Sequence, residues 1–335
     1  MSSTSQLTDF SDLKADLASR LRGQTGVTAT DNIYGRYINI ALQDSMLGFD
    51  YKFPWAERSA RLLTRATYST GTVTATQGSM TLTGTSTVWT TTDAFTIANA
   101  RANGKIKIAG GLTPYTVSSV GGAGTITLSS KFTEATATDT TYIYYEDEYD
   151  LATDFLRPVD AQVFSDEASI DIIGRTEFRR RYPTNSTPGR VAVASIIDFA
   201  PSGNTTPIRR VRFAPPPSTA MTIPYTYITG NLAVSSAGVA AANLSAASDE
   251  PIIPLRYRHA LVFHALYHLY RDRKDDARSQ EAKAEYVDIM NRMQADVEVG
   301  GNRPRFAPRI SARRRPWSGS GRFDIGNRFD RLEDR

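Results

Sequence analysis

A change in composition at residues 66–130 constrains the fold more than any other feature of this sequence. The stretch is dominated by Thr, Ser and Gly, and its only charged residues are Asp93, Arg101, Lys105 and Lys107. β-Branched residues alternate with other residues in short runs, and glycine-containing turns at residues 77–78, 110–111 and 121–122 separate the runs. This pattern is typical of antiparallel strands. We expect a small barrel or sandwich, with strands near residues 72–75, 80–83, 105–108, 125–128 and 142–144.

Helical patterns precede this segment. Phe10, Leu13, Leu17 and Leu21 recur at helical spacing, with acidic residues early and Arg20 late, which suits a helix dipole. A second helix is expected after Thr30 and Asp31, which could act as N-caps, and before Gly48. Its predicted buried face is Ile33, Tyr37, Ile40, Ala41 and Met46 or Leu47. An aromatic turn then follows at residues 51–55.

A second β region and a second helical pair follow the Thr-rich segment. The clearest strands lie at residues 191–199, 208–213 and 221–228, and an Ala/Ser/Gly-rich loop with few anchors, which we expect to be mobile, lies at 233–248. One helix begins after Ile253-Pro254, and a second begins near Asp275 or Asp276. Because only residues 274–276 separate them, we expect an antiparallel pair.

The predicted fold class is therefore α+β. N- and C-terminal helical pairs form a four-helix core, the Thr/Gly-rich antiparallel β domain is inserted, and the C-terminal tail is extended. The expected divisions are a helical hairpin at 1–65, the β domain at 66–147, a second β region with the mobile loop at 148–250, the C-terminal helical pair at 251–299, and an Arg-rich tail at 300–335.

Composition excludes several classes of protein. The chain has no Cys, so a disulfide framework, a Cys-ligated metal site and a thiolate nucleophile are ruled out. It has no apolar run long enough to cross a membrane, and its polar first residues lack a secretion-signal pattern, so we expect a soluble, unsecreted protein with no membrane partner. Residues 301–335 carry ten Arg against four acidic residues, so the excess basic charge of the chain belongs to its tail.

The three histidines are His259, His264 and His268. His264 and His268 lie four residues apart on a predicted helix, which is a metal-ligand spacing. A metalloprotease pattern would need Glu at position 265, where the chain has Ala265, and the sequence places no third ligand nearby. We therefore expect packed or interfacial histidines, no metal site and no cofactor.

Two arginine clusters have aromatic neighbours. Arg179, Arg180 and Arg181 lie between Phe178 and Tyr182, and Arg313, Arg314 and Arg315 precede Trp317. Such clusters can contact nucleic acid through phosphates and base stacking, or dock on an acidic protein surface. Because the remainder of the chain is slightly acidic, we favour protein docking.

Catalytic patterns are missing from the sequence. It contains no nucleophile elbow, no phosphate-binding loop and no dinucleotide fingerprint. Glu146, Asp147 and Glu148 are successive residues, which alternate between the faces of a strand, so we interpret them as a solvated or interfacial acidic patch. We expect no enzyme activity.

The order of these elements and three stretches resemble the head-to-tail connector, or adaptor, proteins of tailed bacteriophages. The first stretch is IALQD at 40–44 leading to FPW at 53–55. The second is GTVTATQGS at 71–79 and GTSTVWT at 84–90, continued by YTVSSV at 115–120 and YIYYEDEYDL at 142–151. The third is Ile253-Pro254 leading to ALV at 260–262 and ALY at 265–267. The resemblance covers about residues 10 to 297, although the β insertion is long for a connector.

The resemblance implies a structural virion protein at the neck, or head-tail junction, assembled in the host cytoplasm. It implies a homo-oligomeric ring, usually a dodecamer, beneath the portal protein, which extends the channel for genomic DNA and provides a platform for a downstream tail or nozzle protein. In this family the C-terminal segment commonly reaches the portal. The corresponding anchors here would be Arg313, Arg314, Arg315, Trp317, Phe323 and Phe329, with Arg179, Arg180 and Arg181 as a contact for DNA or an acidic partner.

A binding module is the alternative. In that case the β domain would recognise a receptor or glycan as part of a tail fibre, and aromatic platforms for sugars would be expected. Trp89, Tyr115, Tyr142 and Tyr144 are the candidates for such platforms. A third alternative is sequence-independent DNA binding, whose affinity would fall steeply with salt.

Overall fold

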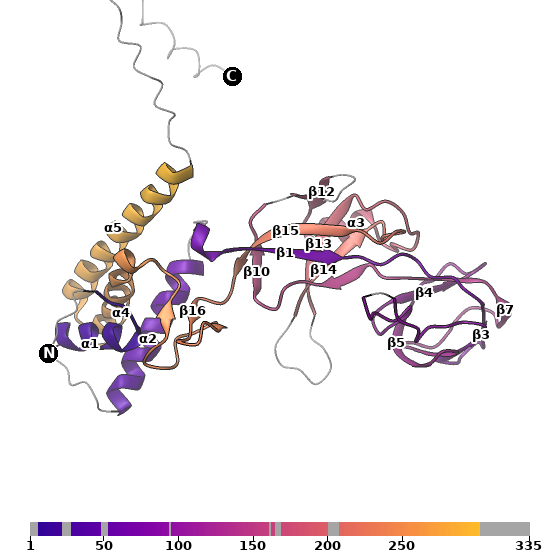
Figure 1. The fold of residues 1–335 in the computed structure, drawn as a ribbon, viewed down its shortest axis with the longest axis horizontal. Coiled ribbons are helices and arrows are strands. Elements are labelled where there is room, and N and C mark those ends of the chain that lie inside the picture. Colours follow the sequence, from indigo (N-terminus) through magenta and orange to yellow (C-terminus); the bar gives the residue numbers. More distant parts are fainter. Residues whose placement is uncertain are drawn as a thin grey trace, which may run out of the picture. The chain divides into compact units, whose positions relative to one another are not determined.

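A computed structural model describes residues 6–21, 28–47, 53–93, 95–160, 162–164, 169–199 and 208–301. In this part of the chain the fold is α+β, with five α-helices and several sheets that are almost entirely antiparallel (Figure 1). None of the helices described here is both long enough and apolar enough to cross a membrane.

Three helices from opposite ends of the sequence contact one another. α1 (Phe10–Arg20) and α2 (Thr28–Leu47) meet, and both touch α4 (His259–Asp272). α1 begins at a capping box in which Asp9 accepts a hydrogen bond from the Asp12 backbone, and it buries Phe10, Leu13 and Leu17 as the sequence predicts.

The predicted buried face of α2 is partly wrong. The helix begins at Thr28, so Thr30 and Asp31 lie inside its first turn, and the exposed fraction of Ile33 is 49%. Its buried apolar residues include Tyr34, Ile38, Ala41, Leu42 and Met46. The helix has apolar side chains around much of its circumference, so its sequence pattern alone does not determine which face is buried. Contact with α1 and α4 determines the buried face.

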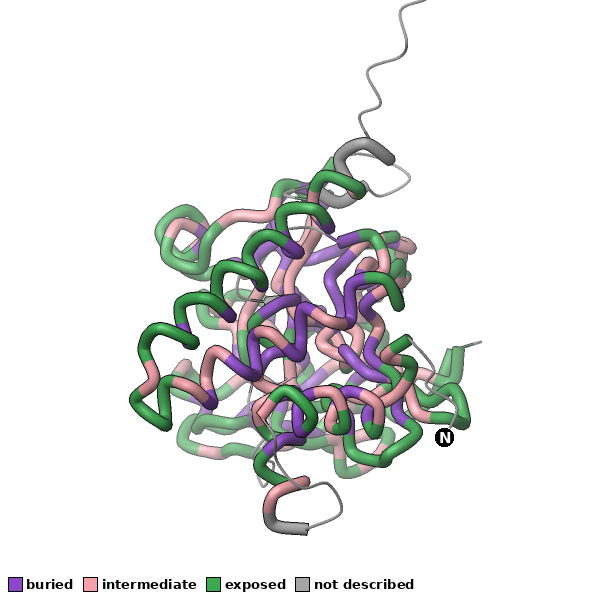
Figure 2. The backbone as a smooth tube through the Cα atoms, turned by 90° about the vertical axis from the view of Figure 1, so that its left-hand side faces the viewer, coloured by how far each residue is buried: buried purple, intermediate pink, exposed green. Residues whose placement is uncertain are grey.

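α5 (Asp276–Gly301) follows α4, and its residues up to 290 run back along α4. The Ser279 hydroxyl donates to the Tyr267 carbonyl, and the ring centroids of His264 and Tyr286 are 4.4 Å apart. The later residue of α5 thus meets the earlier residue of α4, which confirms the predicted antiparallel pair. Figure 2 shows buried and exposed residues alternating along these helices.

Residues 66–147 contain a seven-stranded antiparallel sheet that curls around its own core (Figure 1). The core includes Val73, Leu82, Ile106, Val117 and Ile126, each with no exposed surface. The sheet order is β7 (Ala137–Thr140), β2 (Thr72–Ala75), β3 (Thr81–Thr85), β6 (Thr125–Leu128), β5 (Tyr115–Gly122), β4 (Lys105–Ile108) and β8 (Tyr142–Tyr145). All five expected strands are present.

Two further sheets form the second β region. One has the order β1 (Glu57–Leu63), β15 (Thr222–Thr229), β10 (Phe155–Pro158). The other has the order β11 (Gln162–Phe164), β12 (Ser169–Ile172), β13 (Val193–Phe199), β14 (Ile208–Ala214), β9 (Glu148–Asp150). Leu62 and Ile223 from the first sheet share a core cluster with Val211 and Phe213 from the second. β1 lies where the sequence predicts only the helical hairpin, and it pairs with β15 over its whole length.

The loop expected to be mobile at 233–248 is anchored instead. β16 (Ala233–Val234) pairs with β17 (Ala240–Ala241) and with β18 (Glu250–Pro251). Leu244 is buried, and its backbone carbonyl and amide bond the Asn39 side chain of α2, both at 2.9 Å. The Asn39 side chain of α2 therefore holds this loop in place. The composition of the loop alone does not reveal this contact.

Candidate functional site

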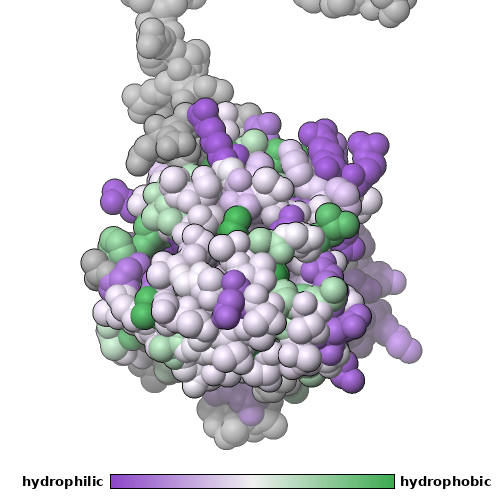
Figure 3. Space-filling model, turned by 90° about the vertical axis from the view of Figure 1, so that its right-hand side faces the viewer, coloured by the Kyte–Doolittle hydropathy of each residue, from purple (hydrophilic) through white to green (hydrophobic). Residues whose placement is uncertain are grey.

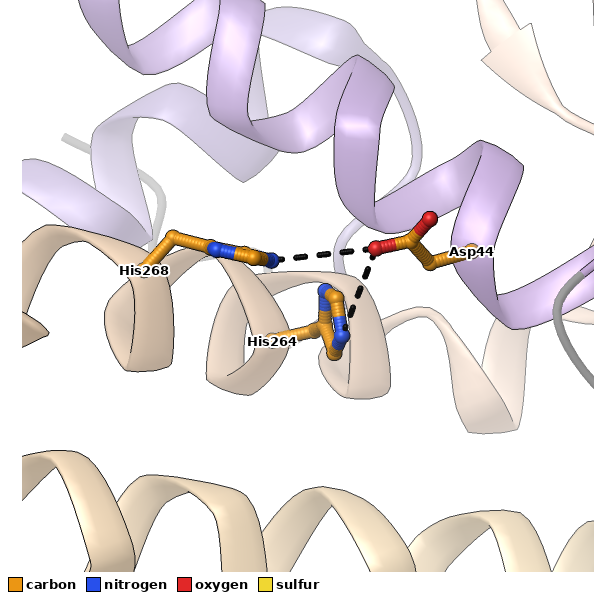
Figure 4. Close-up of side chains that lie close together, drawn as sticks. All are labelled: Asp44, His264 and His268. Atoms are coloured by element: carbon orange, nitrogen blue, oxygen red, sulfur yellow. Dashed lines mark ion pairs between the residues drawn. The ribbon is translucent and has the colours of Figure 1, made fainter.

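A histidine–aspartate cluster lies between α2 and α4. His264 and His268 occupy successive turns on one face of α4, and Asp44 projects toward them from α2 (Figure 4). One ligand atom from each of the three side chains lies within 4.8 Å of the other two. The structure thus supplies the third ligand-type side chain that the sequence could not place.

The histidine nitrogens face the carboxylate at distances too long for hydrogen bonds. Oδ2 of Asp44 lies 3.8 Å from Nε2 of His264 and 3.7 Å from Nε2 of His268. Within the described residues, Nδ1 of His264 and Nε2 of His268 are buried without a hydrogen-bond partner. His264 is 9% exposed, whereas half of the Asp44 side chain is exposed, so the cluster has a buried floor and an accessible side.

Aromatic rings surround the two histidines. The His264 ring lies against Tyr286 of α5, and the His268 ring stacks on Tyr37 of α2 with centroids 6.2 Å apart. The Tyr37 hydroxyl donates to the Asp272 carboxylate at the end of α4. These contacts restrict the orientations that the imidazoles can adopt.

Burial, together with the neighbouring His268, lowers the pKa of His264 to about 4, while Asp44 acts in the opposite direction. The His264 imidazole is therefore neutral at neutral pH. A neutral imidazole has a free lone pair, which is the form that binds a metal.

Arg179, Arg180 and Arg181 lie on α3 (Arg175–Arg181) and are exposed. Glu177 on the same helix forms ion pairs with Arg180 and Arg181. The expectation that Phe178 offers a stacking platform is wrong, because Phe178 is buried against Val193 and Ala214. The three arginines therefore provide positive charge at the surface, but the Phe178 ring beside them is not available for stacking.

The other predicted docking residues, Arg313, Arg314, Arg315, Trp317, Phe323 and Phe329, lie outside the described residues. Their roles stay predictions.

The prediction of a solvated acidic patch at residues 146–148 is wrong, since two of the three carboxylates are buried and form ion pairs. Glu146 is 4% exposed and accepts two hydrogen bonds from the Arg101 guanidinium. Asp147 has no exposed surface, and its Oδ2 accepts from Lys105, Asn185 and Arg212 at 2.6, 3.0 and 2.9 Å. The pattern of successive acids in the sequence did not reveal these partners, which come from distant strands and loops.

The prediction that four aromatic side chains could serve as platforms for sugar binding is also wrong. Trp89, Tyr115, Tyr142 and Tyr144 are at most 3% exposed and belong to the core of the curled sheet. The Trp89 indole donates to the Tyr142 hydroxyl at 2.9 Å, so their polar atoms are used internally. These four rings cannot stack on a ligand.

The face drawn in Figure 3, on the side of β3 and β7, is mostly of intermediate hydropathy, with scattered charged and apolar side chains. This fits the Thr, Ser and Gly content of residues 66–130. Exposed apolar residues of the domain include Phe95 and Leu112, which are 64% and 84% exposed.

Neither a protein-family model nor a curated protein sequence matches this chain.

Proposed function

We propose that this chain is a structural head-to-tail connector of a tailed bacteriophage, which forms a homo-oligomeric ring beneath the portal protein. In this proposal α1, α2, α4 and α5 form the four-helix core of each subunit. The ring, which we expect to be a dodecamer, extends the DNA channel and carries the downstream tail protein. The protein is a virion component with no catalytic role.

The contact of α1 and α2 with α4 is the observation that supports this proposal. Helices from both ends contact one another, and β1 pairs with β15, so residues 57–229 form an insertion between terminal helices. The same order of elements underlies the sequence resemblance to connectors. Subunits that each bury a helical unit and present two different surfaces can close into rings through head-to-tail contacts.

The Arg-rich segment after α5 is the proposed portal anchor. An extended segment can order on a partner when burial of its aromatic side chains offsets the lost chain entropy. Its arginines would bind carboxylates of the portal through paired hydrogen bonds.

Mass measurement tests both parts of the proposal. The full chain, a truncation after Gly301, and a full-length variant with Arg313, Arg314 and Arg315 changed to Ser are each mixed with portal rings of the same phage. We expect the full chain to load the rings in a fixed multiple, the truncation to fail, and the Ser variant to bind more weakly. If no form of the chain binds, the connector proposal is wrong; if the truncation binds as well as the full chain, only the role of the tail is wrong.

The alternative, a fibre-type module whose β domain recognises a receptor or glycan, now rests on exposed side chains such as Phe95 and Leu112. Selective binding of the full chain to one class of glycan on an array, lost in a Phe95→Ser variant, would favour it.

A further inference from the structure

We propose that Asp44, His264 and His268 bind one transition-metal ion of the Zn²⁺ class, which clamps α2 to α4. The proposal does not depend on the connector function, because it concerns the geometry of two helices within one chain. It gives a bonding partner to histidine side chains whose buried nitrogens lack hydrogen bonds in the described part of the chain.

The distances within the cluster suit ligands of one ion better than direct bonding. The two Nε2–Oδ2 separations of 3.7 and 3.8 Å exceed the range of a hydrogen bond. Ligand atoms of a tetrahedral zinc site, at 2.0–2.1 Å from the metal, lie about 3.3 Å from one another. A shift of a few tenths of an ångström at the half-exposed Asp44 side chain would bring both distances close to this value. The third separation, between the two histidines, lies within 4.8 Å and has to reach the same value when the ion binds.

The unpartnered nitrogen of His268 is the second observation. Nε2 of His268 is buried, has no hydrogen-bond partner in the described part of the chain, and points at the Asp44 carboxylate (Figure 4). An unsatisfied buried polar atom costs free energy, and a metal between this nitrogen and the carboxylate would satisfy it.

The donor set selects the class of metal. Two imidazoles and one carboxylate suit Zn²⁺, Co²⁺, Ni²⁺ or Cu²⁺, whereas Mg²⁺ and Ca²⁺ prefer oxygen ligands. Three protein ligands leave a fourth position on the exposed side for water. The chain has no Cys and only three histidines, so a tight transition-metal site has few other places to form.

Metal titration of the untagged full chain, after treatment with EDTA, tests the proposal. Calorimetry with Zn²⁺ should give one ion per chain, and Co²⁺ should produce the visible absorption bands of a four-coordinate nitrogen–oxygen site. Zn²⁺ should also raise the melting temperature, because binding to the folded state stabilises it. Mg²⁺ should do neither.

Variants assign the ligands. Asp44→Ala changes a half-exposed side chain and should keep the fold, yet it should weaken Zn²⁺ binding at least about tenfold and alter the Co²⁺ bands. His268→Ala should abolish the bands. His259→Ala, on the first turn of the same helix, is the matched control and should bind as the unchanged protein does.

Two results would overturn the proposal. One is the absence of stoichiometric Zn²⁺ binding to the folded, EDTA-treated chain. The other is binding that Asp44→Ala and His268→Ala leave unchanged, because the ion would then lie elsewhere.

Discussion

Asp147 shows how a single side chain can join strands that are distant in sequence. Its Oδ2 accepts hydrogen bonds from Lys105 on β4, Asn185 after α3 and Arg212 on β14, and the residue has no exposed surface. Its backbone carbonyl also accepts from the Phe213 amide at 2.8 Å. A buried carboxylate of this kind is tolerated because two cations surround it.

We predict that Asp147→Asn lowers the free energy of unfolding by about 3 to 5 kcal/mol, because Lys105 and Arg212 lose their buried counter-charge. The matched control is Glu148→Gln, the neighbouring carboxylate, which lies 3.7 Å from Arg212 and retains partial solvent contact. Its loss should cost about 1 kcal/mol or less. Urea denaturation at pH 7 measures both values, and equal losses would contradict this account of the Asp147 network.

The burial of His264 predicts a pH dependence of stability in the metal-free chain. Its pKa is about 4 in the folded protein and ordinarily 6.5. In the described part of the chain, the titratable groups that face it include His268, Asp44, Tyr267 and Tyr286. Between these values the unfolded chain binds a proton that the folded chain does not, so stability falls as the pH falls from 6.5 to 4. The shift corresponds to about 3 kcal/mol.

Denaturation in EDTA at pH 7 and pH 4 measures this contribution as the difference between the unchanged protein and a His264→Gln variant. The variant should lose less stability on acidification, by about 3 kcal/mol. Parallel curves for the unchanged protein and His264→Gln would show that His264 is not held neutral.

Among the elements, the strands of the curled sheet follow from the sequence more closely than the helices do. Period-two alternation identified five strands, because one face of each strand lies on the core. The alternation is of Thr with apolar residues in β2, β3 and β6, of Lys with Ile in β4, and of Tyr with Ile in β8. β1 was missed because its charged residues do not alternate clearly and its pairing with β15 spans most of the chain. The Asp44 carboxylate was missed for the same reason, since nothing local relates α2 to α4.

Glycines before β2 and at the β2–β3 turn provide a test at the level of elements. Gly71 and Gly78 both have φ of +82°, but a Cβ on Gly71 would lie 2.4 Å from the Thr85 carbonyl oxygen, whereas one on Gly78 would meet nothing within 4 Å. We predict that Gly78→Ala costs about 1 to 2 kcal/mol through backbone strain alone. Gly71→Ala should cost about 1 to 3 kcal/mol more, because the β2–β3 pairing must shift.

Thermal and urea unfolding of the two glycine variants separates these effects, since the backbone conformation is matched and only the steric contact differs. An equal loss of stability in the two variants would show that the end of β3 can move away from a Cβ at position 71. It would contradict the predicted steric clash with the Thr85 carbonyl oxygen.

At the scale of the whole molecule, the inserted sheet carries a core of its own. The buried residues of its cluster run from Val73 to Tyr144, and the cluster includes none from the terminal helices or the other sheets. Its contacts with the second β region include polar ones made by Asp147 and by Tyr145, whose hydroxyl donates to the Asn185 carbonyl. A domain with its own hydrophobic core can in principle fold alone.

We therefore predict that residues 66–147 fold as an isolated fragment. Its amide NMR spectrum should be well dispersed, and it should unfold cooperatively on heating, because the seven strands and their core are all retained. A fragment carrying Leu82→Asp, which places a charge at a position with no exposed surface, is the control and should be unfolded. A poorly dispersed spectrum for the unchanged fragment would mean that the Asp147 contacts with Asn185 and Arg212 are needed to fold the sheet. The curled sheet would then be a continuation of the second β region rather than a domain of its own.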